Sequence, residues 1–480
     1  MEEINDNESI ISESSVSSNE SNIPLLSFIE TLNDDEIVEF TSTCFEMIDD
    51  YVEQNMLQMC DPHFYEQLVF EITNLFIDEW KDANIYNIDE DDDDEIYTWI
   101  ESISNDYFDM LKEDFPLRSQ KTDPQYSVLK KSIQKKLAHI RSIPQPEQRT
   151  PEWYKFRHEL MTASNLWKLF GTESQYNSLI YEKCVPLKED VPQYSGDVNI
   201  LSPMHWGQKY EPLSIMLYEH KYKTKIEDFG CIQHDKYSFI GASPDGINVD
   251  PNNNKYGRML EIKNIVNREI DGIPSKAYWI QMQLQMETCD LDDCDFLETR
   301  FKQYNNEEEF YQDETQNKGV IIHFIERISI GCGFGDPNAT EDSSGYMLAQ
   351  QTSGAPKYVY MPLDIPLVKE TIEQWIEEQR MKLRRSWSIY SVDYWKLDEF
   401  SCVYVERNKK WFQQAAPIIE KAWNTILKER ETGYEHRAAK KRIVKNNALE
   451  IIQGEQDNKI IKNLPMTGGI CLVKLDKEDR

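Results

Sequence analysis

Two short apolar segments of this 480-residue chain end in charged residues, and their arrangement constrains the fold. The segment GASPDGI places Asp245 after an apolar run, and LEIK places Glu261 and Lys263 two residues apart. Side chains alternate between the two faces of a strand, so Glu261 and Lys263 share one face while Ile262 points to the other. If the two strands pair, Asp245 joins them, and two carboxylates and one ammonium meet at one point.

Such a cluster predicts a binding site for a hard divalent cation. Two converging oxygen ligands suit an ion that keeps several waters and binds substrate phosphates. A lysine beside the ion can position an attacking water, so the set is sufficient for metal-assisted phosphodiester hydrolysis. Each motif alone has a plainer interpretation, because Glu-x-Lys is a common surface pair and Ser-Pro-Asp-Gly is a turn.

Three further blocks flank these motifs in a fixed order. They are Arg-x4-Thr-Ala-Ser (Arg157, Thr162, Ala163, Ser164), Gly-x3-Glu (Gly207, Glu211) and Tyr-x2-Gln-x-Gln (Tyr278, Gln281, Gln283). Together with Asp-Gly and Glu-x-Lys, they make roughly residues 148–300 resemble the YqaJ-type viral recombinase nucleases. This family includes phage lambda exonuclease and belongs to the PD-(D/E)XK superfamily.

The resemblance implies roles for the residues at the cation site. Asp245, Glu261 and the main-chain carbonyl of Ile262 would bind one or two Mg²⁺ or Mn²⁺ ions. Lys263 would position or deprotonate the attacking water. Glu211, on a helix, would approach the same metals, in one version through a water.

The resemblance also implies a pocket for a terminal 5′-phosphate, formed by Arg157 and Ser164 with Thr162 nearby. Gln281 would orient the lysine or the scissile phosphate. Chemistry supports the pocket independently, since arginine makes bidentate bonds to phosphate and a Thr-Ala-Ser segment opening a helix offers hydroxyl and N–H donors. A plain helix N-cap is the alternative for Thr162 and Ser164.

The acidity of the chain is concentrated at one end. Residues 1–120 contain 33 acidic and three basic residues, whereas the other 360 residues contain 53 acidic and 49 basic ones. The field of the acidic segment would repel DNA, but the nearly balanced remainder can hold a basic groove. The acidic segment is therefore expected to contact another protein or a second copy of the chain.

Composition and periodicity divide the chain into five parts. We predict a disordered acidic tail at 1–22, and an acidic all-helical domain at 23–120 with a solvated loop at 89–95. Residues 121–149 read as a basic helix and linker, whose lysines would face either phosphate or the acidic domain. Residues 150–365 are predicted to form an α/β PD-(D/E)XK nuclease core, with a central mixed β-sheet flanked by helices. Residues 366–480 are predicted to form a mostly helical extension, which either lines a nucleic-acid path or only covers the sheet.

The sequence therefore predicts a metal-dependent deoxyribonuclease. The most specific reading is a 5′→3′ exonuclease on double-stranded DNA ends, in recombination, repair or defence, and its direction rests on the resemblance alone. The alternatives are a structure-dependent or endonucleolytic nuclease of the same fold, and a non-enzymatic DNA-binding or protein-interaction module that uses the acidic domain.

Partners and location follow from the same observations. We expect a homo-oligomer, either a dimer or a ring, with a recombination or defence protein as a possible partner of the acidic domain. The chain lacks an apolar run of 18 residues, which predicts no membrane partner. The acidic, polar N-terminus predicts no secretion signal and a cytoplasmic location, in the host cytoplasm if the protein is viral.

Overall fold

The computed structural model describes residues 32–83, 90–111, 115–121, 130–146, 150–187, 203–327 and 356–439. The described residues up to Ala438 belong to one compact unit. The tail predicted at 1–22 lies outside the described residues. So does the end of the predicted C-terminal extension, from residue 440 onward.

The acidic segment contains helices, as predicted. They are α1 (Asp34–Gln54), the 3₁₀ helix η2 (Met56–Cys60), α2 (Phe64–Ala83) and α3 (Glu90–Met110). Apolar side chains at helical spacing face inward in α1, and the Phe40 ring stacks on Trp99 of α3 with centroids 3.9 Å apart. Asn33 and Glu36 form a capping box at the start of α1.

The prediction of a loop at 89–95 is wrong for residues 90–95. Residues 90–95 form the first turns of α3. A run of carboxylates is favourable there, because the N-terminus of a helix carries a partial positive charge. The acidic run therefore starts a helix instead of separating two helices.

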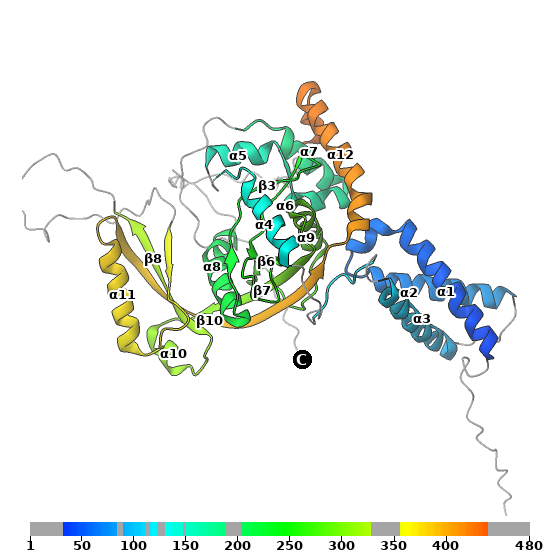
Figure 1. Cartoon of the computed structure of the whole chain (residues 1–480), viewed down its shortest axis with the longest axis horizontal. Coiled ribbons are helices and arrows are strands. Elements are labelled where there is room, and N and C mark those ends of the chain that lie inside the picture. Colours follow the sequence, from blue (N-terminus) through cyan, green and yellow to red (C-terminus); the bar gives the residue numbers. More distant parts are fainter. Residues whose placement is uncertain are drawn as a thin grey trace, which may run out of the picture. The chain divides into compact units, whose positions relative to one another are not determined.

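A seven-stranded mixed sheet forms the core, as predicted (Figure 1). Its strand order is β2 (Ile226–Glu227), β5 (Gly246–Asn248), β6 (Met259–Asn264), β7 (Asp293–Gln303), β10 (Trp387–Glu406), β8 (Lys318–Glu326) and β9 (Lys357–Tyr360). Strands β6 and β7 run parallel, and the other neighbouring pairs run antiparallel. A smaller sheet pairs β1 (Met161–Thr162), β4 (Ile240–Ala242) and β3 (Ile232–Gln233).

Helices flank these sheets. They are α4 (Lys130–Ser142), α5 (Pro151–His158), α6 (Ala163–Leu166), η3 (Trp167–Phe170), α7 (Glu173–Cys184), α8 (Pro203–Tyr222), α9 (Lys276–Cys289), α10 (Glu307–Gln312), α11 (Lys369–Leu383), α12 (Lys409–Thr432) and η4 (Glu435–Arg437). Helix α9 is buried on nearly every side, because it packs against α6 and α12 as well as β4 and β7. The glutamines of the candidate site lie on this helix.

The C-terminal region differs from the prediction in one element. Helices α11 and α12 confirm the predicted helical character, but residues 387–406 form β10, which pairs with β7 on one side and β8 on the other. This segment is rich in aromatic and β-branched residues, which suit a pleated, half-buried surface. The central sheet therefore extends beyond the predicted core boundary at residue 365.

The acidic helices dock on the core through specific hydrogen bonds. Arg118 donates to the carbonyls of Cys60 and Pro274. The indole of Trp411 donates to the Leu57 carbonyl at 3.3 Å, and that of Trp279 to the Arg118 carbonyl at 3.0 Å. Residues 56–60 and 115–120 are therefore part of the packing of the core.

Helix α4 also packs on the core. Leu137 and Ile140 are buried, Lys136 lies 3.3 Å from a carboxylate oxygen of Asp290, and Arg141 pairs with Glu227. In the described residues these two basic side chains thus pair with core carboxylates and not with the acidic helices.

Candidate active site

The pairing of β5 with β6 brings the three predicted residues together. Gly246 lies opposite Leu260 in this antiparallel pair, so Asp245 falls beside Glu261. The Ile262 backbone N–H donates to Asp245 Oδ2 at 2.7 Å. Lys263 Nζ donates to Glu261 Oε1, although the Glu261 side chain is completely buried.

Two glutamines of α9 hold the Glu261 carboxylate. Gln281 Nε2 donates to Oε1 at 2.7 Å, and Gln285 Nε2 donates to Oε2 at 2.8 Å. Gln281 was predicted near the site and Gln285 was not. The signal was present in the sequence, because residues four apart lie on the same face of a helix. Gln283 faces elsewhere, and its side chain contacts the backbone of Glu406 and Asn408.

Electrostatics keep the lysine charged and disfavour charge on Asp245. Burial, and then the neighbouring Glu261, raise the pKa of Asp245 well above its usual value, and Glu211 of α8 adds to the rise. Burial alone would lower the pKa of Lys263, but Glu261 and Asp245 outweigh it and raise that pKa. Lys263 Nζ also lies 4.8 Å from the ring centroid of Tyr278. The lysine is therefore an ammonium donor at neutral pH.

The oxygen atoms at this site are of the kind that bind a hard divalent cation. Glu261 is buried and Asp245 is half-buried. Two adjacent carboxylates repel each other, and a cation between them would remove that cost. Gln285 Oε1 is buried and has no hydrogen-bond partner in the described part of the chain, so a further oxygen nearby is unsatisfied. Among the described residues, however, no group of three or more His, Cys, Asp and Glu side chains is placed to hold a metal. Glu211 thus lies near enough to raise the pKa of Asp245, but it does not form a three-carboxylate metal site with Asp245 and Glu261.

A cavity of about 190 Å³ contains part of the predicted phosphate pocket. It is lined by Tyr154, Arg157, His158, Thr162, Asn165, Glu182, Lys183 and Leu187. Exposed Ser164 is not in this lining, but its hydroxyl lies 3.4 Å from that of Thr162. The Thr162 side chain makes no capping bond to α6.

Hydrogen bonds through Ser243 connect this cavity to the carboxylates. Arg157 Nη1 donates to Ser243 Oγ at 3.4 Å. Gln285 Nε2, which also holds Glu261, donates to the Ser243 carbonyl at 3.1 Å. Ser243 and Gln285 therefore link the two predicted subsites through hydrogen bonds.

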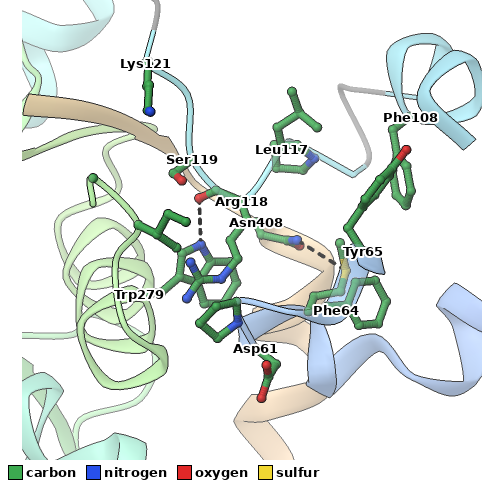
Figure 2. A pocket seen from close by; sticks show the side chains of 15 residues that line it. Asp61, Phe64, Tyr65, Phe108, Leu117, Arg118, Ser119, Lys121, Trp279 and Asn408 are labelled. Atoms are coloured by element: carbon green, nitrogen blue, oxygen red, sulfur yellow. Dashed lines mark hydrogen bonds between the residues drawn. The ribbon is translucent and has the colours of Figure 1, made fainter. Parts of the chain in front are cut away.

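A larger cavity of about 340 Å³ lies where the acidic helices meet the core (Figure 2). Phe64, Tyr65 and Phe108 line one side, and Trp279 with Arg118 lines the other. Its lining includes none of the residues predicted to bind metal or phosphate. It marks the joint between the two regions.

Glu261 and Lys263 lie on β6 and Asp245 comes directly before β5, so a mixed sheet flanked by helices holds the two carboxylates and the lysine together. Residues 152–292 match the family model of the YqaJ-like viral recombinase domain. All the predicted site residues lie within this range.

Other comparisons give more distant similarities. The uncharacterized protein R354 of Acanthamoeba polyphaga mimivirus is 29% identical over 321 residues, which cover 60% of this chain and 54% of R354. The chain therefore spans about half the length of that curated relative. The alkaline exonuclease LHK-Exo of Laribacter hongkongensis is 17% identical, with a TM-score of 0.31 over 60% of this chain and 95% of the exonuclease. The same enzyme in complex with dAMP gives 16% identity and a TM-score of 0.29 over the same shares.

None of the helices in the described ranges is both long enough and apolar enough to cross a membrane.

Proposed function

We propose that this protein is a Mg²⁺- or Mn²⁺-dependent deoxyribonuclease, which acts as a 5′→3′ exonuclease on double-stranded DNA ends. The observation that carries the proposal is the cluster of Asp245, Glu261 and Lys263, held in place by Gln281 and Gln285. An ordinary surface Glu-x-Lys pair would not bury its glutamate completely and surround it with three side-chain donors.

Each side chain has a distinct role in this proposal. Asp245, Glu261 and the Ile262 carbonyl would hold one or two ions, with Glu211 nearby. A bound divalent ion supplies Lewis acidity and a more acidic water. Lys263 is charged, so it would orient the attacking water or the phosphate oxygen by donating a hydrogen bond. Gln281 shares Glu261 Oε1 with Lys263, so it would fix the direction of the lysine.

The 5′→3′ direction depends on the cavity that contains Arg157 and Thr162. Arg157 is a donor suited to a phosphate monoester, and its guanidinium lies 4.6 Å from the Trp153 ring centroid. Capture of a terminal phosphate there would place the next phosphodiester toward Asp245. Ser164 would contribute through its contact with Thr162.

Two parts of the proposal concern partners. The acidic helices would keep DNA away from their own surface and would contact a recombination or defence protein. A dimer or a ring would hold the DNA during successive cleavages. Sedimentation of the full chain with and without a DNA duplex measures this assembly.

The test is cleavage of end-labelled DNA in Mg²⁺ or Mn²⁺, on linear duplexes with a 5′-phosphate or a 5′-hydroxyl and on a covalently closed circle. We expect mononucleotide release from linear phosphorylated ends and no cleavage of the circle. Cleavage of the circle would favour an endonuclease, whereas binding without any cleavage would favour a non-enzymatic module. Glu261→Gln is the matched inactive control, because it keeps the size of the side chain.

A further inference from the structure

Lys183 of α7 is a buried cation at the wall of the cavity that contains Arg157. Lys183 is only 5% exposed, and its side chain is one of those that line the cavity. Its Nζ donates to the Arg157 carbonyl at 2.7 Å. No carboxylate in the described residues lies within ion-pair distance of this ammonium. Two of its three donors thus have no acceptor within the described ranges of the chain.

A buried ammonium with one main-chain acceptor is unusual, because lysine is almost never fully buried unless it is paired. The surroundings add positive charge. Arg157 faces it from α5, and Arg430 of α12 donates to the Lys183 carbonyl at 3.0 Å. Glu182 offsets this only partly, since Lys168 pairs with it at 3.0 Å. The cavity therefore concentrates positive charge on a surface that an anion can reach.

We propose that Lys183 is a second cationic ligand for the terminal 5′-phosphate and acts beside Arg157 in this cavity. The inference rests on the proposed function, since it assumes that the cavity receives a DNA end. A phosphate monoester carries close to two negative charges at neutral pH and has three strong acceptor oxygens. It can therefore accept from the Arg157 guanidinium and from the free N–H groups of Lys183 together.

Protonation links this contact to pH. Burial, then Arg157 and Arg430, lower the pKa of Lys183 to about 8, while Glu182 and Cys231 raise it. His158 also lines the cavity and contacts the Val185 carbonyl and Glu159. Lys183 is therefore charged at pH 7 and loses its charge through pH 8 in the empty pocket. Preference for a phosphorylated end should fall in the same range.

A structural role is the competing explanation. The carbonyl of Arg157 lies in the last turn of α5, where a lysine often satisfies the free carbonyls. A capping lysine would affect the stability of the fold but not the choice between two DNA ends. The ratio of kcat/KM on 5′-phosphate ends to kcat/KM on 5′-hydroxyl ends therefore separates the two roles.

The experiment measures this ratio from pH 6.5 to 9.5 for the wild type, Lys183→Met and Lys183→Arg. Lys155→Met is the matched control, because Lys155 is an exposed lysine of α5 outside the cavity lining. We expect a wild-type ratio that falls above pH 8. It should drop about tenfold in Lys183→Met at pH 7, the effect of one charge-assisted hydrogen bond. Lys183→Arg should keep much of the ratio without the pH dependence, and Lys155→Met should behave as the wild type.

The failures are distinguishable. If the wild type shows no preference for phosphorylated ends, the pocket itself is wrong. If the wild type has the preference and Arg157→Ala removes it, while Lys183→Met keeps it, only the role of Lys183 is overturned. Binding of the two duplexes in EDTA, followed by fluorescence anisotropy, gives the same comparison if a variant turns over too slowly. A lowered melting temperature with an unchanged ratio would identify Lys183 as a helix cap.

Discussion

Replacing Asp245 by Asn should stabilise the metal-free protein while abolishing cleavage. Asparagine has nearly the same shape and can still accept the hydrogen bond from the Ile262 N–H. It removes a charge that burial and Glu261 disfavour. The predicted gain therefore comes from relieving a cost that the folded wild type carries at its site.

The magnitude follows from three contributions. Charges 4–6 Å apart interact by about 3–4 kcal/mol at an effective dielectric constant of 20. Repulsion from Glu261 and attraction to Lys263 act in opposite directions and offset each other in part. The desolvation of the carboxylate remains, and it costs at least about 1–3 kcal/mol because the group is charged. We expect Asp245→Asn to raise the free energy of unfolding by an amount in this range.

The gain should depend on pH with a definite sign. The pKa of Asp245 is raised in the folded state, so the folded protein binds a proton more tightly than the unfolded chain does. The stability that the Asp245 carboxyl contributes to the wild type is therefore fully present below its pKa of about 3.9 in the unfolded chain. This contribution is lost as the pH rises through the pKa of Asp245 in the folded protein. The advantage of the variant should be near zero at acid pH and should grow toward pH 8.

Urea unfolding in EDTA at several pH values measures this difference, and added Mg²⁺ provides the control. Mg²⁺ should stabilise the wild type by mass action and leave Asp245→Asn nearly unchanged. A variant that is less stable than the wild type at every pH would refute the reasoning. An equal gain at pH 4 and pH 8 would show that the effect is not electrostatic. Stabilisation of both proteins by Mg²⁺ would remove Asp245 from the ligand set.

Three further predictions concern neighbouring residues. Lys263→Met should lower the turnover of bound DNA by about 100-fold or more while changing duplex affinity little; single-turnover kinetics measures both, and a pure loss of affinity would make the lysine a phosphate anchor. Gln285→Met should raise the Mg²⁺ concentration needed for half-maximal cleavage several-fold, because Glu261 Oε2 loses its donor; Gln283→Met, on the same helix but facing away from Glu261, is the control, and equal effects of the two would contradict a specific role. A chain beginning at Lys121 should unfold at a lower temperature or aggregate, because it removes the Leu57 and Arg118 carbonyls that accept from two buried tryptophans; an unchanged melting temperature would show that the acidic helices form an independent domain.

Much of the candidate site was predictable because it depends on local patterns. Alternation along β6 put Glu261 and Lys263 on one face, and the pairing with β5 then brought Asp245 to them. Gln281 was found through the family motif. Gln285 has no place in that motif, although its spacing from Gln281 puts both on the same face of α9.

The sequence by itself determined the strand pair that carries the charges, the helical character of the acidic segment, and the match of residues 152–292 to a family model. These depend on side-chain periodicity and short motifs, which are local properties of the chain. Tertiary structure alone decided that β10 enters the centre of the sheet and that residues 115–120 pack on the core. It also placed Lys183 beside the pocket of Arg157. Those contacts join residues up to hundreds of positions apart. Their free energy comes from burial and hydrogen bonds that exist only after the chain has folded, so no local pattern encodes them.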